Sequence, residues 1–413
     1  MGESRPGRLR AGLVIVLWVG AFALAALYIA SWIRNPTPLG QPWQESNGNL
    51  LDFRDLVTVP GRYLLEGGNP YNPGPYLAAH PWAQEFDPYA PAWLILSVAL
   101  GWLPLEVGAA IYFAGTSVLM AVMARIVTRW VAPRYADLAA PLLMGWLLLW
   151  YRTRVMGSTF IVVLGALLVF RAIATGDKRW VATVGMALVW LKPQFGLPLS
   201  LLWICAGQWR VVARGTGLIA AVSIPPFVAC AWNEGGPIKL VQSVLASAQH
   251  ASSPASPTGV LSPFNVRIDF VGLSARLTHE VADAVPLIAC LVVLVATVGV
   301  LVWAKPDPLL LPGLIVPTVL LLPVHLNYDL GMAVIPATTA LILARQRGGV
   351  LRWLGAAAFL LIVAHLIKFT TALGGSALDA DLADVVLLAM GYLASIVVAL
   401  TGLRRRAPRA SLA

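Results

Sequence analysis

Charged residues are scarce in this sequence. Asp, Glu, Lys and Arg make up 12% of its 413 residues, whereas 59% are hydrophobic. Soluble proteins carry about 25% charged residues, because their surfaces must be covered with polar groups. This composition excludes a soluble globular protein and indicates a chain with many membrane-spanning segments.

Other absences exclude further classes of site. The three cysteines, Cys205, Cys230 and Cys290, show no CxxC or ligand spacing, so neither disulfides nor a thiolate metal site is predicted. The five histidines form no HxxxH or HExxH pattern, so we expect no catalytic metal. No GxGxxG or P-loop sequence is present between a strand and a helix pattern, which argues against a nucleotide-binding domain. The net charge of +10 lies in short clusters between apolar runs, which is typical of membrane orientation signals and not of nucleic-acid binding.

Long apolar runs predict an all-α polytopic membrane protein that forms one domain over 1–413. The first run, "AGLVIVLWVGAFALAALYIASWI", has no charge and is too long for the core of a cleavable signal peptide, so we expect a retained helix. Twelve spans are predicted, near 11–33, 90–103, 106–124, 136–151, 157–173, 180–206, 212–232, 284–304, 308–324, 330–344, 353–371 and 385–403.

Basic clusters predict the orientation. They precede the first span (Arg5, Arg8, Arg10), follow the last (Arg404, Arg405, Arg406) and flank the loop near 345–352 (Arg345, Arg347, Arg352). The positive-inside rule places all three clusters and both termini in the cytoplasm, as expected for a plasma-membrane protein with an even number of crossings. Two versions of 90–210 remain open: either 90–103 crosses, or it is re-entrant and 180–206 is two half-helices broken at Lys192–Pro193. In both versions, residues 34–89, 233–283, 325–329 and 372–384 are external.

Two of the external loops are large. The first, 34–89, holds six of the chain's 19 acidic residues and an amphipathic stretch that predicts a helix on the membrane surface, broken at Pro60–Gly61. The second, 233–283, begins with the amphipathic "PIKLVQSVLASAQHA" and continues rich in Ser and Pro. This composition is typical of a mobile segment that covers a site, although a plain connector fits it as well.

Polar residues in or beside the external loops are candidates for chemistry. Asp52 can act as a general base, and Asp55 lies three residues on, on the same face of a helix; solvated surface acids are the alternative. His325, with Tyr328 and Asp329 beside it, ends a span and can hydrogen-bond a phosphate or a carboxylate; a structural histidine is the alternative.

Three basic residues are candidates for phosphate binding. Lys192 lies within an apolar run, where a lysine costs about 2.5–3.5 kcal/mol on insertion scales, so we expect an anionic partner such as a lipid headgroup, or else snorkelling or an internal acid. Arg54 and Arg267 have the guanidinium geometry that grips phosphate, but each can equally pair with a neighbouring acid, Asp55 or Asp269.

Several segments occur in an order that resembles a known family. They are "DF" at 52–53, "GGNPY", "FDPYAPAWLILSVALGWLPLEVGAAIYF", "LKPQFGLPLS" and "HLNYDL". Their order and spacing over roughly 10–345 resemble glycosyltransferase family 87, in the GT-C superfamily of polytopic transferases, which includes mycobacterial mannosyltransferases that elongate phosphatidylinositol mannosides.

The resemblance implies a GT-C-type helix bundle and a substrate, not a cofactor: a polyprenyl-phosphate sugar donor, used on the external face. It implies inverting transfer of a hexose such as mannose to a glycolipid or cell-envelope glycan, with no metal. The family's aspartate base matches Asp52, but the tyrosines usual after that acid are replaced by "RDLVTV", which leaves Asp55 as a possible substitute. His325 matches a residue that contacts the substrate near the donor phosphate.

Two other functions fit a polytopic chain. A secondary transporter would show inverted repeats or paired broken helices, and no repeat is evident. A flippase or ligase for lipid-linked glycans would share the phosphate-binding chemistry. The large acidic loop directly after the first span favours the transferase.

The orientation can be checked by labelling. In a chain without its three native cysteines, Asp52→Cys should react with a membrane-impermeant maleimide in intact cells, because residues 34–89 are predicted to be external. Arg405→Cys should react only after permeabilisation. Protection of position 52 until the cells are opened would contradict the predicted orientation.

Overall fold

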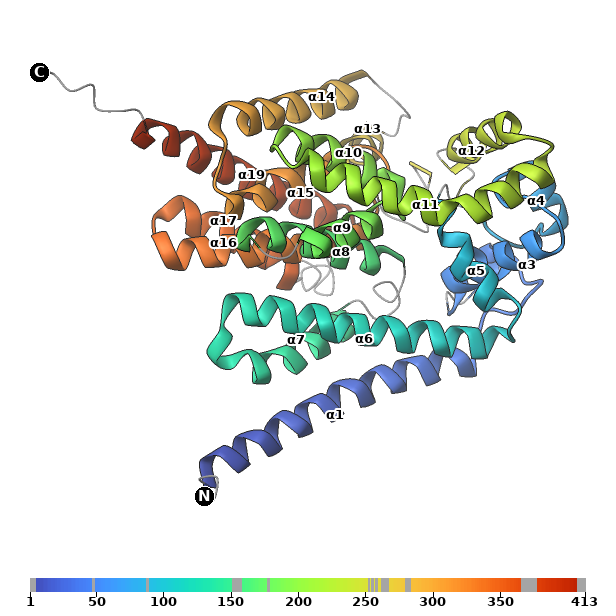
Figure 1. The fold of residues 1–413 in the computed structure, drawn as a ribbon, viewed down its shortest axis with the longest axis horizontal. Helices are drawn as coiled ribbons and strands as arrows, with labels where there is room; N and C mark the ends of the chain where they lie inside the picture. The colour runs from blue at the N-terminus through green and yellow to red at the C-terminus, as the bar shows by residue number, and fades with distance from the viewer. Residues whose placement is uncertain are drawn as a thin grey trace, which may run out of the picture. The chain divides into compact units, whose positions relative to one another are not determined.

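The computed structural model describes residues 5–46, 49–86, 89–150, 158–176, 179–251, 267–278, 284–364 and 377–406, together with 253, 256, 259 and 260. Within this described part the chain is helical, and its one β-type pairing is an isolated bridge between Arg267 and Leu326. The predicted all-α class is therefore confirmed. The chain forms two compact units, residues 1–164 with 219–251 and residues 165–218 with 252–413 (Figure 1). The prediction of one membrane domain over 1–413 stays a prediction.

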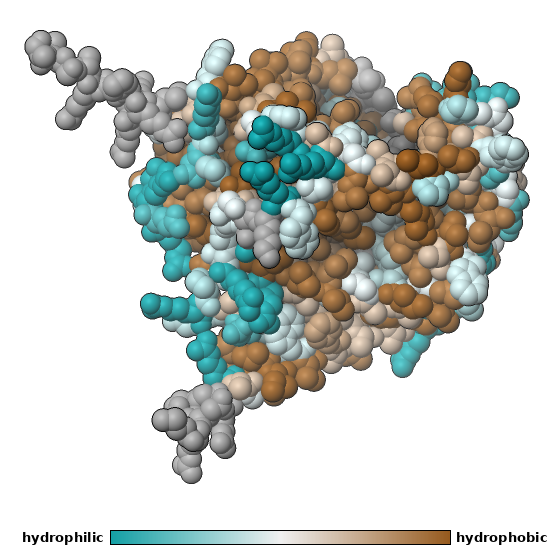
Figure 2. Space-filling view, in the orientation of Figure 1, coloured by the Kyte–Doolittle hydropathy of each residue, from teal (hydrophilic) through white to brown (hydrophobic). Residues whose placement is uncertain are grey.

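Six helical segments of the described chain are long and apolar enough to cross a membrane. They lie in α1 (Arg5–Arg34), α6 (Leu105–Val131), α8 (Ser158–Thr175), α11 (Trp209–Glu234), α14 (Ala284–Gly299) with the π-turn η4 (Val300–Ala304), and α19 (Ala377–Arg406). Much of the surface in Figure 2 is correspondingly hydrophobic. The membrane character is confirmed, whereas the count of twelve spans is not: several predicted spans are apolar helices of only 10–17 residues, including α17 (Val350–Ala364).

The predicted span at 180–206 is two half-helices, α9 (Arg179–Val189) and α10 (Pro193–Cys205). Pro193 begins α10, where its missing N–H costs nothing, and it holds Lys192 in an extended conformation with φ −115° and ψ 99°. The break at Lys192–Pro193 is therefore confirmed, while the path of 90–210 across the membrane stays a prediction. The predicted span at 90–103 is α5 (Trp93–Gly101), whose nine residues reach only about 14 Å and so cannot cross a bilayer.

In the first unit, the predicted amphipathic helix is present but is not broken at Pro60–Gly61. Helix α2 (Leu51–Phe53), the π-turn η2 (Arg54–Thr58) and α3 (Val59–Leu65) follow one another without interruption. A proline within a helix deprives the carbonyl four residues earlier of its partner, which here is Leu56. The Leu56 carbonyl accepts instead from Trp93 Nε1 at 2.8 Å, and the π-turn re-spaces the ladder just before Pro60. The predicted break is therefore wrong.

This helix is partly buried, because α3 packs closely against α5. A Cβ on Gly61 would lie 2.0 Å from the Ser97 carbonyl oxygen. Arg62 donates from Nε to the Gly101 carbonyl at 2.6 Å and from Nη2 to the Leu103 carbonyl at 2.9 Å, which satisfies the carboxyl end of α5. The charge of Arg62 thus serves packing within the unit.

The remaining elements of the first unit surround this core. Helices α1, α6 and α7 (Ala136–Trp150) pack together, with α4 (Pro73–Ala79) against α12 (Pro237–Ala251) and short 3-10 turns η1 (Trp43–Glu45) and η3 (Pro133–Tyr135). The buried face of α12 carries Ser243 and Ser247, while Ile238 and Leu245 are exposed. Such inverted polarity is typical of a helix against lipid. The rest of the second loop, including 261–266 and 279–283, lies outside the described residues, so its role as a cover stays a prediction.

The second unit is built around α15 (Leu311–Leu321), in which every residue is buried. It packs against α10, α14, α16 (Val334–Arg347) and α19. The Thr297 hydroxyl joins three of these helices, with Thr318 Oγ1 and Tyr392 OH each 2.7 Å away. Helix α13 (Phe270–Thr278) and the 3-10 turns η5 (Pro308–Leu310) and η6 (Asn327–Ala333) complete the unit.

The close approach at Gly61 generates a stability prediction. Gly61→Ala should lower the apparent Tm of the detergent-purified protein, because the added methyl forces α3 away from α5; overpacking of this kind costs about 1–3 kcal/mol. The matched control is Gly115→Ala in α6, where a Cβ would meet nothing within 4 Å. Differential scanning fluorimetry measures both, and an equal Tm for the two variants would contradict the packing.

Candidate active site

In the first unit, one short helix presents Asp52 outward and anchors its neighbour. Asp52 is exposed on α2, whereas Phe53 is 2% exposed. The Phe53 ring lies 5.3 Å from that of Tyr112 and 6.0 Å from that of Phe113, both on α6. Because Phe53 is held by two aromatic rings, the direction of Asp52 is fixed by the core.

Arg54 and Asp55 form a fully buried ion pair. Arg54 donates to Asp55 from Nε at 2.7 Å and from Nη2 at 3.1 Å, and the Gln84 N–H donates to the same carboxylate at 3.1 Å. The other N–H groups of Arg54 donate to the carbonyls of Pro38 (2.7 Å), Gln41 (2.9 Å) and Trp82 (3.3 Å). All five N–H groups of the guanidinium are therefore used, and a phosphate could be gripped only by breaking these bonds. The paired alternative for Arg54 is the one observed.

Burial makes Asp55 a different acid from Asp52. Removal from water raises the pKa of Asp55 from 3.8 to about 6, against the opposing effect of Arg54 and the Gln84 N–H. The negative charge of Asp52 raises the pKa further, so the two carboxyl groups lie within electrostatic reach. One helix thus carries an accessible carboxylate and an enclosed one.

Glu234, which sequence reasoning missed, anchors the loop that follows. At the end of α11 its carboxylate accepts from Asn69 Nδ2 and Asn72 Nδ2, both at 2.7 Å, and from the Ser243 hydroxyl at 2.9 Å. The two asparagines belong to "GGNPYN", so this carboxylate holds the turn between α3 and α4. A lone acid closing an apolar run, in "WNEGGP", was the available signal.

An aromatic cluster lies beside the buried pair. The rings of Tyr63, Tyr76 and His80 contact one another at 5.4–5.6 Å, and the His80 ring lies 5.5 Å from that of Trp82, over which the Arg54 guanidinium sits. Burial raises the pKa of Tyr76 well above 10, and the negative charge of Asp55 adds to this. Within the described part of the chain, the buried Tyr76 hydroxyl meets no hydrogen-bond partner.

In the second unit, His325 is at the centre of a buried polar cluster. Its Nδ1 lies 3.3 Å from Asp329 Oδ2, its backbone N–H donates to Asp269 Oδ2 at 3.1 Å, and its ring lies 4.6 Å from that of Phe195. The side chain is fully buried, and among the described residues its Nε2 has no hydrogen-bond partner. With Nδ1–H directed to Asp329, neutral His325 offers Nε2 as an acceptor, and the imidazolium form offers it as a donor.

Arg267 is paired in the same way as Arg54. It donates to Asp269 from Nε at 2.8 Å and from Nη2 at 3.0 Å, and Asp269 also accepts from the Gly272 N–H at the start of α13. The Arg267–Leu326 bridge and the bond from the Ile268 N–H to the His325 carbonyl attach this pair to the histidine. The neighbouring acid is again the observed partner.

Lys192 is buried, three residues before Phe195 in the break between the half-helices. The side chain of Tyr328 lies outside the described residues. The structure thus brings together Asp52, Arg54 and Asp55 in one unit, and Arg267, His325 and Asp329 in the other. Within the described residues no group of His, Cys, Asp and Glu fits a metal ion, and metal independence stays a prediction.

A sequence profile of glycosyltransferase family 87 matches residues 88–322, more than half of the chain. The chain belongs to glycosyltransferase family 87. Comparison with curated proteins and with solved structures finds no match. The family resemblance is therefore confirmed, and with it glycosyltransferase activity in a membrane protein.

The range that matches the family profile contains only some of the candidate site residues of this family 87 glycosyltransferase. It contains Lys192, Arg267 and Asp269, but begins after Asp52 and ends before His325. Membership of the family therefore supports the reaction class, while the roles of Asp52 and His325 rest on residue chemistry and on their surroundings.

The raised pKa of Asp55 in this glycosyltransferase predicts a pH dependence of stability. Between about pH 4 and pH 6 the folded chain holds a proton on Asp55 that the unfolded chain has lost, so the free energy of unfolding falls as pH rises through this window. Asp55→Asn abolishes this titration. The apparent Tm of wild type minus that of Asp55→Asn should be larger at pH 4 than at pH 7. The change corresponds to about 3 kcal/mol in the free energy of unfolding.

The control for this pH profile is Glu66→Gln, which alters an exposed acid of the same loop. It should not reproduce the profile expected of Asp55→Asn. A constant Tm difference between wild type and Asp55→Asn would show that Asp55 does not titrate there.

Proposed function

We propose that this glycosyltransferase moves a hexose, most simply mannose, from a polyprenyl-phosphate donor to a glycolipid or cell-envelope glycan on the external face of the plasma membrane. A lipid-linked donor suits a chain whose sequence offers no nucleotide-binding pattern and whose helices are apolar. The predicted orientation of residues 34–89 supports the external face.

We choose the base by exposure, because Asp52 is exposed whereas the neighbouring Asp55 is enclosed. A general base must come within hydrogen-bond reach of the proton that it removes. Asp55 is fully buried and already accepts three hydrogen bonds, whereas Asp52 is exposed on a helix that is anchored by Phe53. We therefore assign the base to Asp52 and a positioning role to Asp55.

The reaction is a single inverting displacement. The Asp52 carboxylate takes the proton of the acceptor hydroxyl as its oxygen attacks the anomeric carbon from the face opposite the phosphate. The new glycosidic C–O bond forms as the anomeric carbon–phosphate oxygen bond breaks, and the electron pair leaves with polyprenyl phosphate. The atoms and electrons of this displacement balance without an oxidant or a metal.

Positive charge is required where the phosphate departs. In the second unit, Lys192 and His325 suit this role by residue type, and the buried Nε2 of His325 is the atom with which an imidazolium would donate to a phosphate oxygen. Arg54 and Arg267 are excluded from this part of the proposal because each is bound to its own carboxylate.

The assignment of the base is tested by Asp52→Asn. Transfer by purified protein in lipid should fall by about 10²–10⁴-fold, because the amide cannot accept the proton, while the apparent Tm stays unchanged. Mass spectrometry of the product from a polyprenyl-phosphate sugar, with membrane glycolipids as acceptors, measures the rate. Glu45→Gln, in the same loop, is the matched control and should retain full activity. Normal transfer by Asp52→Asn would reject Asp52 as the base.

A further inference from the structure

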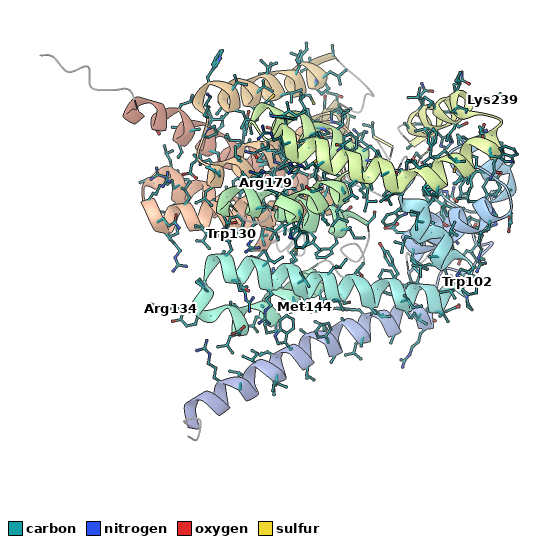
Figure 3. All side chains as sticks on the ribbon, in the orientation of Figure 1. Trp102, Trp130, Arg134, Met144, Arg179 and Lys239 are labelled. Carbon is teal, nitrogen blue, oxygen red and sulfur yellow. The ribbon has the colours of Figure 1, made fainter. Side chains whose placement is uncertain are left out.

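Three arginines converge on a cavity in the second unit that has no part in the proposed transfer. The cavity has a volume of about 430 Å³ and lies where α8 ends and α9 begins, and where α10 ends and α11 begins. Arg179, Arg210 and Arg214 line it, with Gln208 and Trp209. Figure 3 marks Arg179 at the start of α9, and Figure 2 shows a hydrophilic patch over the start of α11 with hydrophobic surface beside it.

Helix packing brings these arginines together. A Cβ on Gly215 would lie 2.3 Å from the Cβ of Met186 and 3.0 Å from the Thr183 carbonyl oxygen, so α11 meets α9 at its first turns. Arg214 directly precedes this contact, and Arg179 is the first residue of α9. The N-termini of α9 and α11 both lie at the cavity. The first N–H groups of a helix have no partner within it and favour negative charge.

The cavity lacks a counter-charge among its described residues. Its lining contains no Asp or Glu, and none of the ion pairs of the described chain involves Arg179, Arg210 or Arg214. Asp177 and Lys178, between α8 and α9, lie outside the described residues. Three guanidinium groups that share one cavity repel one another, and an anion with several oxygens relieves this and matches their forked N–H geometry.

The surroundings of the cavity indicate a lipid. Trp180 and Trp209 flank it and are 63% and 56% exposed, as expected at the level of the lipid headgroups. Leu201 and Ile204, in the last turns of α10, are also exposed and offer apolar surface for acyl chains. A soluble anion would make no use of these groups, whereas a phospholipid uses all of them.

We propose that this cavity binds the phosphate headgroup of an anionic phospholipid and not the sugar donor. In the predicted orientation the residues from 206 to 212 face the cytoplasm, so the bound lipid belongs to the cytoplasmic leaflet, where anionic lipids attract arginines. The site couples the ends of α8, α9, α10 and α11 to the composition of that leaflet. It stands independently of the proposed base and donor.

Native mass spectrometry of the purified full chain tests the proposal. Phosphatidylglycerol should remain bound after mild delipidation, and phosphatidylethanolamine of the same acyl chains should not. The triple variant Arg179→Gln, Arg210→Gln, Arg214→Gln should bind phosphatidylglycerol about 100-fold more weakly, since each of the three arginines near an anionic surface contributes roughly a factor of five. The matched control, Arg125→Gln, Arg129→Gln, Arg134→Gln, removes three arginines of α6 and η3 that do not line the cavity and should bind as wild type.

Four further measurements decide between sources of phosphate and exclude misfolding. Phosphatidylglycerol should raise the wild-type Tm, and the rise should shrink with salt and be absent in the cavity variant. Glycerol 3-phosphate at the same concentration should give no rise; an equal effect would overturn the lipid assignment in favour of a soluble phosphate. Displacement of the lipid by polyprenyl phosphate, or equal losses in both triple variants, would overturn the site itself. Without lipid, both variants should unfold at the wild-type Tm.

Discussion

The first unit depends on the Arg54–Asp55 pair. Arg54 binds not only its neighbour but also the carbonyls of residues 38, 41 and 82, and Asp55 binds the N–H of residue 84. One buried pair thus ties both ends of the long loop to the helix that carries Asp52. Removing one member of such a pair leaves an uncompensated buried charge, at a cost of about 3–5 kcal/mol. A lysine could not replace Arg54, because its three donors cannot reach five acceptors.

The second unit repeats this arrangement around a different centre. Arg267 and Asp269 are also two residues of one local segment, and they also hold a backbone stretch, that of His325. In both units, the ion pair positions a neighbouring polar residue and does not itself reach outward. Asp52 and His325, the two residues proposed for the chemistry, each lie beside such a pair.

Much of the fold could be predicted from the sequence, because hydrophobic length and composition depend on local residues. The helical class, the membrane character and the break at Lys192–Pro193 follow from apolar runs and from proline chemistry. The length of each helix does not: 90–103 was counted among the spans, with a re-entrant form left open, yet α5 has only nine residues. The break expected at Pro60 failed because the partner of the Leu56 carbonyl, Trp93, is 37 residues away in sequence.

The candidate site was only partly predictable for the same reason. Asp52, Lys192 and His325 are noticeable in the sequence as polar residues in the first loop or in or beside apolar runs, but the contacts that enclose the Arg54–Asp55 pair come from residues 38, 41, 82 and 84. Glu234 escaped notice because its partners, Asn69 and Asn72, lie more than 160 residues earlier. The arginine cavity escaped notice because Arg179 and Arg214, 35 residues apart in sequence, line one cavity only where α9 and α11 pack together at Gly215.

The distance in sequence between Glu234 and the "GGNPYN" turn has a consequence for biosynthesis. The ribosome must add about 160 residues after Asn72 before its carboxylate partner exists, which takes on the order of 10–30 s at ordinary translation rates. During that interval the turn has left the ribosome with its amide groups facing water or the translocation machinery. The turn that follows the Asp52 helix is thus made well before the carboxylate that holds it, and this contact forms only once α11 has been synthesised.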